Sequence, residues 1–150
     1  MITTAIVSII HPHQHKQGMD VHEYLVSQKT FGEVMKYWPS TFSGFQIINN
    51  RVSPPHRDCG APYSALDALT AIGEYSGGHI RLCNGPFEFL QPLGSVLALS
   101  SRIFEHEVTA YEGNRISFAW FVKDAIYQWA KRPQIPWSLD STLLDEFHEL

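Results

Sequence analysis

Cysteine, charge and long apolar runs are all scarce in this sequence, and each scarcity excludes a class of protein. Cys59 and Cys83 are the only cysteines and form no CxxC pair, which argues against a disulfide framework and against a cysteine-based zinc site. No apolar run reaches the roughly 18 residues needed to cross a bilayer. The first ten residues lack the basic segment and cleavage site of a signal peptide. We therefore expect an intracellular protein without a membrane span.

The remaining composition is that of a folded domain. Hydrophobic residues make up 44% of the 150 residues, which is enough for one domain with its own core. The net charge of −4 arises from four acids in the last eleven residues, so the rest of the chain is neutral and lacks the basic footprint of a typical nucleic-acid binder. A local basic strip could still be built from Arg51, Arg57, Arg81, Arg102, Lys131 and Arg132.

The N-terminal part, residues 1–40, reads as a strand and a helix that support the rest. Thr3–Ile10 is rich in β-branched residues and predicts a strand. His11–His15 carries three alternating histidines, for which a solvated turn is favoured over a metal site because Pro12 interrupts it. Asp20–Tyr37 predicts a helix, with a capping-box-like start at Asp20 and Glu23.

Residues 41–123 change to short strands separated by Gly and Pro turns, which predicts a mainly β domain with flanking helices, of the jelly-roll type. The expected strands are Gly44–Asn50, Ala65–Ile72, His79–Cys83, Phe87–Leu90, Ser95–Leu99, Glu105–Ala110 and Arg115–Val122. Residues 124–150 should add two helices, Asp124–Lys131 and Ser141–His148.

The residues that indicate chemistry are His56, Asp58 and His106. In an extended HxD segment both side chains point to the same side and can hold one ion from adjacent positions. His106, from another expected strand, can supply the third ligand. Two imidazoles and one carboxylate on one face of an octahedron leave three positions open, which is the ligand set of non-haem Fe(II) oxygenases.

Arg115 and Ser117 complete the pattern. They follow His106 across an expected turn, Tyr111–Asn114, so they should lie on the neighbouring antiparallel strand and share one face of it. A guanidinium and a hydroxyl on one face suit a bound carboxylate. The order HxD, His and Arg-x-Ser is far more specific than any of these pieces alone.

These motifs resemble the 2-oxoglutarate/Fe(II)-dependent dioxygenases of the TET/JBP branch, and fungal TET-like proteins in particular. The resemblance lies in PPHRDCGAPYSALDALTAIGEYSGGHIRL, PLGSVLALSSRIFEHEV and GNRISFAWFVKD. It implies a double-stranded β-helix, the cofactors Fe(II), 2-oxoglutarate and O2, and iron ligands at His56, Asp58 and His106. It also implies that Arg115 and Ser117 hold the distal carboxylate of 2-oxoglutarate and that Asn50 or Arg51 contacts the other one.

For the substrate, the resemblance implies a methylated nucleobase that is flipped out of the helix. It favours 5-methylcytosine in DNA, with N6-methyladenine or RNA as alternatives, and hence a nuclear location. Candidate pocket residues are Tyr63, Asp67, Tyr75 and Trp120, with Phe45 beside them. Asp67 could bind an exocyclic amine or could face solvent. Other functions left open are the same oxidation of a small metabolite or protein side chain, and a non-catalytic cupin-like binding protein.

Overall fold

The computed structural model describes residues 1–138, and its strands follow the expected order. The helices are α1 (Ile2–Ile10), α2 (Pro12–Val26), α3 (Gly32–Met35) and α4 (Asp124–Trp129). The strands are β1 (Gly44–Asn49), β2 (Asp67–Gly77), β3 (Ile80–Leu82), β4 (Glu88–Phe89), β5 (Val96–Leu99), β6 (His106–Val108) and β7 (Tyr111–Phe121). The predicted helix Ser141–His148 lies outside the described residues.

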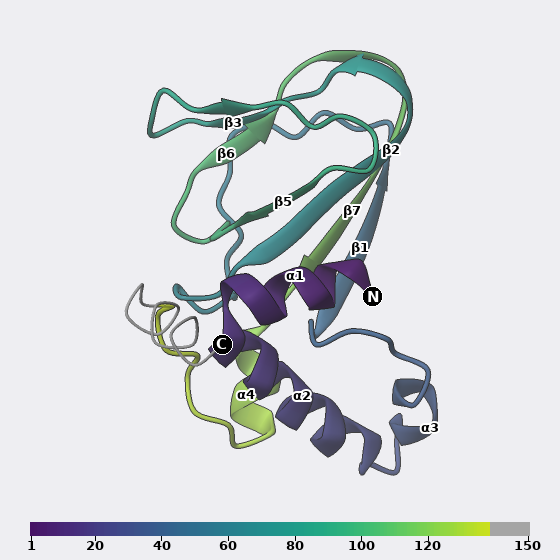
Figure 1. Cartoon of the computed structure of the whole chain (residues 1–150), viewed down its shortest axis with the longest axis vertical. Helices are drawn as coiled ribbons and strands as arrows, with labels where there is room; N and C mark the ends of the chain where they lie inside the picture. The colour runs from purple at the N-terminus through teal and green to yellow at the C-terminus, as the bar shows by residue number, and fades with distance from the viewer. Residues whose placement is uncertain (139–150) are drawn as a thin grey trace, which may run out of the picture.

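The strands form two antiparallel sheets. The larger has the order β1-β7-β2-β5 and the smaller the order β4-β3-β6. The long strands β2 and β7 are paired from Ala68 opposite Trp120 to Gly77 opposite Tyr111, and they form the centre of the larger sheet. Figure 1 shows both sheets at one end of the molecule and the helices at the other. The predicted fold class, mainly β with flanking helices, is confirmed.

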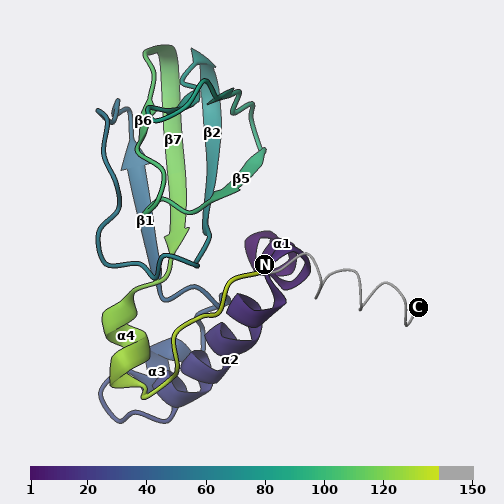
Figure 2. The ribbon, with the colours of Figure 1, turned by 90° about the vertical axis from the view of Figure 1, so that its left-hand side faces the viewer.

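A shared core joins the helices to the end of the larger sheet. Val7 of α1, Val21 of α2 and Tyr127 of α4 are buried together with Ala68 of β2 and with Val122, which follows β7. Figure 2 shows that α1, α2 and α4 gather below the ends of β1, β2 and β7. This packing covers one end of the sheet, so the opposite end and the space between the sheets are left for a site.

The predicted strand at Thr3–Ile10 is wrong, because these residues form α1. Thr3 and Val7, one helical turn apart, are both fully buried. Helical spacing therefore buries one face of the segment, and this tertiary burial outweighs the local β preference of its β-branched residues. A strand would have placed Thr3 and Val7 on the same side too, so the sequence alone did not distinguish the two.

The predicted turn at His11–His15 and the predicted start of the next helix at Asp20 are also wrong. Pro12 occupies the first position of α2, where a helix needs no N–H, and the Nδ1 of His11 caps the helix by accepting the Gln14 N–H. His11 is buried, and its Nε2 lies 3.0 Å from the carbonyl oxygen of Ser64. Its two ring nitrogens are thus engaged with protein groups. The predicted helix Asp20–Tyr37 is divided at Ser27 into α2 and α3.

The expected strands are all present, with shifted ends, but the expected turn at Tyr111–Asn114 is wrong. These residues belong to β7 and pair with Glu74–Gly77 of β2. Gly73 and Gly113, both at positive φ, lie in this region of the two strands. As a result β6 and β7 belong to different sheets, and Arg115 does not lie on a strand neighbouring His106. Arg115 and Ser117 still share one face.

Candidate functional site

His56, Asp58 and His106 come together as the sequence predicted. One ligand atom of each lies within 4.8 Å of the others. His56 Nε2 is 3.8 Å from Asp58 Oδ1, and the two imidazole centroids are 4.4 Å apart. An antiparallel bridge causes this proximity: the His56 N–H donates to the His106 carbonyl at 3.0 Å, and the His106 N–H donates back at 2.9 Å. The loop that carries HxD is thus fixed to β6.

Backbone carbonyl groups determine which ring nitrogen of each histidine is free. His56 Nδ1 lies 2.7 Å from the Pro54 carbonyl oxygen, and His106 Nδ1 lies 3.0 Å from that of Phe104. Since a carbonyl oxygen only accepts, each Nδ1 carries the proton and each Nε2 presents a lone pair. Burial also lowers the pKa of His106, which favours the neutral, metal-binding form. The donor set therefore fits a divalent metal ion.

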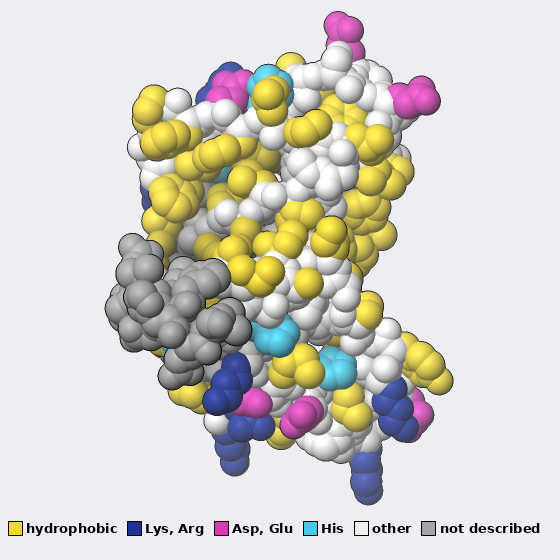
Figure 3. Space-filling view, viewed as in Figure 1, with side chains coloured by type: hydrophobic (Ala, Val, Ile, Leu, Met, Phe, Trp, Pro, Cys, Tyr) yellow, Lys and Arg dark blue, Asp and Glu magenta, His cyan; other side chains and the backbone are white. Residues whose placement is uncertain are grey.

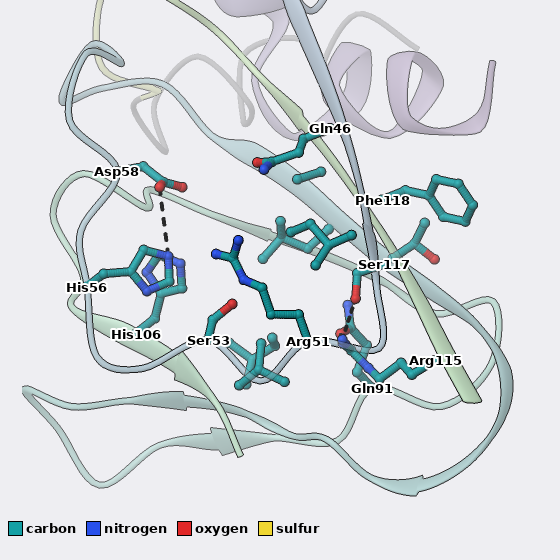
Figure 4. A pocket seen from close by; sticks show the side chains of 16 residues that line it. Gln46, Arg51, Ser53, His56, Asp58, Gln91, His106, Arg115, Ser117 and Phe118 are labelled. Carbon is teal, nitrogen blue, oxygen red and sulfur yellow. Dashed lines mark hydrogen bonds and ion pairs between the residues drawn. The ribbon is translucent and has the colours of Figure 1, made fainter. Parts of the chain in front are cut away.

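The three ligands line one end of a cavity of ≈ 160 Å³ between the two sheets. Ile80 and Val108 of the smaller sheet and Ile48 and Leu69 of the larger sheet contribute apolar walls. Figure 4 shows the histidine pair and Asp58 on one side of this cavity and Arg115, Ser117 and Gln91 on the other. The sequence thus predicted residues of both ends of the cavity.

Arg115 is 2% exposed and has no carboxylate within ion-pair distance among residues 1–138. Its guanidinium donates to Ser117 Oγ and to Gln91 Oε1, and it lies 5.5 Å from the centre of the Tyr75 ring. Its Nε and the Nε2 of Gln91 are buried without a partner in the described part of the chain. A buried cation with spare donors fits a ligand carboxylate.

Gln91 was missed by the sequence analysis, because it lies in the loop between β4 and β5 with no motif around it. Gly78 is also needed for the placement of the Arg115 side chain. It adopts φ +69°, and a side chain there would press on the Cδ and Nε of Arg115. Gly77-Gly78 indicates a turn in the sequence. It also leaves the space in which the arginine lies.

Of the two candidates for the proximal carboxylate, the structure brings only Arg51 into the cavity. Figure 4 shows its guanidinium pointing between the histidine pair and Gln46. The side chain of Asn50 is engaged elsewhere: its Oδ1 accepts the Arg115 backbone N–H at 2.7 Å and its Nδ2 donates to Asn114 at 3.1 Å. Asn50, at φ +46°, thus ties the end of β1 to β7 beside Arg115.

The aromatic substrate candidates do not line this cavity. Tyr63 is 58% exposed beneath the Arg102 guanidinium, and Tyr75 donates to the Gln91 carbonyl behind Arg115. Trp120 packs against Phe45, 4.9 Å between centroids, and against the core. Alternation along β7 explains this placement, since Arg115, Ser117 and Ala119 face the cavity, Phe118 reaches only its edge, and Trp120 faces away.

Asp67 and Phe121 lie at a second, adjoining cavity. Asp67 does not face solvent, because it is 2% exposed and accepts a hydrogen bond from Ser101. Burial raises its pKa to about 7. Phe121, which the sequence analysis did not select, continues the cavity-facing alternation of Arg115, Ser117 and Ala119. That alternation was the signal that could have found it.

Three of the six residues considered for a basic strip are engaged elsewhere. Arg81 pairs with Glu88 and Glu107, Arg102 pairs with Asp124, and Arg51 turns into the cavity. On the face shown in Figure 3, Lys and Arg side chains gather mainly around the helices, and hydrophobic side chains dominate over the sheets. Within residues 1–138 no helix has the length and apolar character of a membrane span.

Comparison with known proteins places these observations in a family. The sequence profile of the Tet_JBP family, described as the oxygenase domain of the 2OGFeDO superfamily, matches residues 1–124. The solved structure of NgTET1 in complex with 5mC DNA is similar in fold, with a TM-score of 0.56 and 17% sequence identity over 85% of this chain. The match spans 49% of the NgTET1 chain, so this chain corresponds to about half of that protein. No curated protein matches significantly.

Most of the chain, with both ends of the cavity, lies within the matched segment, and so this chain belongs to the Tet_JBP family of 2OGFeDO oxygenase domains.

Proposed function

We propose that this chain is a 2-oxoglutarate/Fe(II)-dependent dioxygenase that oxidises the methyl group of 5-methylcytosine in DNA. The observation that carries the proposal is the pairing of two features in one cavity. A metal-ligand set lies at one end, and a buried arginine without a counter-ion lies at the other. A dicarboxylate with a metal-chelating keto acid group satisfies both ends at once.

At the metal end, the chain holds the ligands before metal arrives. The Pro54 and Phe104 carbonyls orient the imidazoles, and Asp58 supplies the negative charge that offsets part of the charge of the cation. Fe(II) bound there supplies the oxidation of a C–H bond by O2, with 2-oxoglutarate converted to succinate and carbon dioxide. Three protein ligands leave positions for the cosubstrate and O2.

At the other end, Arg115, Ser117 and Gln91 bind the distal carboxylate of 2-oxoglutarate. The guanidinium provides charge and fixed geometry, and the Ser117 hydroxyl and the Gln91 amide hold it in place. Arg51 reaches the same cavity and contacts the carboxylate near the metal. The two guanidinium groups outnumber the single acid, Asp58, among the groups that line this cavity, which favours an anionic ligand.

The choice of 5-methylcytosine is supported by the family and by the DNA complex of the NgTET1 structure. Arg81 and Arg102 are paired with acids, so we expect few phosphate contacts from them and a weak dependence of DNA affinity on salt. A DNA substrate also implies a nuclear location, which imaging of the tagged protein tests.

The test is turnover of a methylated duplex by the purified chain with Fe(II), 2-oxoglutarate and ascorbate. Nucleoside mass spectrometry should detect hydroxymethylcytosine or further oxidised cytosine, with succinate formed in step. The Asp58→Ala variant is the negative control, because it removes a metal ligand and changes no other residue that could contact DNA. Succinate formation with no oxidised base would retain the dioxygenase and reject the DNA substrate. No succinate under any condition would reject the enzyme.

A further inference from the structure

A second cavity of ≈ 90 Å³ adjoins the first one on the metal side. Four residues line both cavities: Gln46, Asp58, Leu69 and Ala119. We call the second cavity the inner compartment, and its own lining includes Asp67 and Phe121. Since Asp58 is a wall of both cavities, a ligand in the inner compartment lies beside a metal ligand while the distal carboxylate site at Arg115 stays free.

Asp67 presents an unused acceptor to the inner compartment. The Ser101 hydroxyl donates to its Oδ2 and the Val122 backbone N–H also favours the charged carboxylate, whereas its Oδ1 is buried without a hydrogen-bond partner among residues 1–138. The charged groups that influence it are Asp58 and Lys123, and Lys123 forms no ion pair with it in that part of the chain. A buried carboxyl oxygen without a donor is costly, so a ligand donor is expected at this position.

Phe121 supplies a flat wall for the same compartment. It pairs with Gly44 of β1, and a side chain on that glycine would occupy the position of the Phe121 ring. The Lys123 ammonium lies 4.8 Å from the ring centroid, at the edge of the compartment. An aromatic face and a single polar acceptor are what a planar, amine-bearing ring requires.

We propose that Asp67 selects the base, because its free Oδ1 accepts a hydrogen bond from the exocyclic amine of 5-methylcytosine. This inference rests on the proposed function. Thymine carries the same methyl group but has a carbonyl at the position of the amine. While Asp67 is ionised, two acceptors then face each other without a hydrogen atom between them, so thymine is rejected. Asp67 is thus a specificity-determining residue for the methylated pyrimidine.

The amide variant Asp67→Asn provides the sharpest test. Ser101 can donate to the amide oxygen, which leaves the NH2 group at the position of Oδ1. An NH2 group opposes the amine of cytosine and matches the carbonyl of thymine. We therefore expect the ratio of kcat/KM for 5-methylcytosine over thymine to fall at least tenfold, with thymine oxidation unchanged or raised. The two duplexes are identical except for the target, which is placed opposite an abasic site in both so that base-pair strength does not differ.

Two controls separate selection from stability. Ser101→Ala removes the other partner of Asp67 and leaves Oδ1 in the compartment, so it should keep the wild-type ratio. Succinate formation without DNA, measured for wild type and Asp67→Asn, reports on the metal and 2-oxoglutarate sites separately from the base. Because the readout is a ratio of two substrates on one protein, a change at those sites cancels from it. A substrate-side test needs no variant: the 5-methyl-2-pyrimidinone nucleotide, which lacks the amine, should react with wild type at least tenfold more slowly than 5-methylcytosine.

The outcomes are distinguishable. If Asp67→Asn keeps the wild-type ratio, or if the amine-free analogue reacts as fast as 5-methylcytosine, Asp67 does not select the base and the proposed function stands. If wild type oxidises neither pyrimidine, the proposed function and this inference fail together, before any variant is made.

Discussion

The two ends of the cavity solve the problem of polar burial in opposite ways. At the metal end, the side chains of His56 and Asp58 are 37% and 49% exposed, and every ring Nδ1 has a carbonyl partner. At the other end, Arg115 is almost completely buried and keeps donors without a partner in the described part of the chain. At the metal end, neighbouring backbone groups therefore satisfy the polar atoms that do not bind the ion. At the arginine end, buried donors are left for a ligand to satisfy.

This difference assigns different roles to the two ends. An exposed ligand set can exchange its ion and admit O2 and substrate. A buried arginine fixes how deep a carboxylate lies and excludes water from it. Substitutions at the two ends should therefore affect different measurements.

The largest expected effect is at the metal end. Asp58→Ala removes the anionic ligand, so succinate formation should fall to background in a 2-oxoglutarate turnover assay. Glu112→Ala, which removes an exposed acid on β7, is the matched control and should behave as wild type. Wild-type turnover in Asp58→Ala would show that Asp58 is not a ligand of the catalytic metal.

At the buried end, Arg115→Ala should raise the KM for 2-oxoglutarate about 100-fold. Two charge-assisted hydrogen bonds are lost, and each tenfold loss of affinity corresponds to about 1.4 kcal/mol. The KM for DNA, measured at saturating 2-oxoglutarate, should change little. A larger effect on DNA than on 2-oxoglutarate would show that the two ends do not divide their roles in this way.

Metal binding should stabilise the fold without being needed for it. An excess of Mn(II) at about 100 times its Kd should add about 2.7 kcal/mol to the free energy of unfolding, seen as a higher Tm in a thermal melt. Chelator should reverse the gain. Asp58→Ala should show almost none of it, and an equal gain in that variant would place the ion elsewhere.

Asp67 extends the comparison, because it is a buried acid on the metal side of the cavity. Burial raises its pKa to about 7, Asp58 acts in the same direction, and Ser101, the Val122 backbone N–H and Lys123 oppose it. The folded state thus binds a proton that the unfolded state has released, so stability falls as pH rises from about 4 to 7. Between pH 5 and 8, wild type should lose about 2 kcal/mol relative to Asp67→Asn in chemical denaturation. Parallel pH profiles of the two proteins would contradict this.

The smallest effect is expected at Ser117, which supports Arg115 through a neutral hydroxyl. Ser117→Ala should raise the KM for 2-oxoglutarate about fivefold, since such a bond contributes about 1 kcal/mol. Thr70→Val, at another hydroxyl in the cavity lining, is the matched control and should leave that KM unchanged. If Ser117→Ala equals Arg115→Ala, the hydroxyl and not the guanidinium dominates the carboxylate site.

Much of this site could be predicted because its key residues obey strand alternation. His56 with Asp58, and Arg115 with Ser117, each repeat at two residues, and a period of two is visible in the sequence. Gln91 could not be found in this way, since a loop residue has no period. The strand that pairs with β6 could not be predicted either. The Glu112–Asn114 segment has the composition of a turn, but it pairs with β2 and extends β7.

The N-terminal segment was misjudged for a different reason. Thr3–Ile10 has the composition of a strand, but it is the surface against which it packs that decides its structure. The side chain of Gln14 shows the same dependence on distant partners. It exchanges two hydrogen bonds with the backbone of Leu66, each at 2.8 Å, which no local pattern indicates. The boundaries proposed for the domain's parts stay a prediction.

The bridge between His56 and His106 has a practical consequence. In small zinc domains the ion itself creates the fold, and its removal unfolds the chain. Here two backbone hydrogen bonds hold the ligand-bearing segments together without help from a metal. The stripped protein can therefore be reloaded with another divalent ion, and cobalt(II) in that position gives a visible absorption band that reports directly on which ligands are bound.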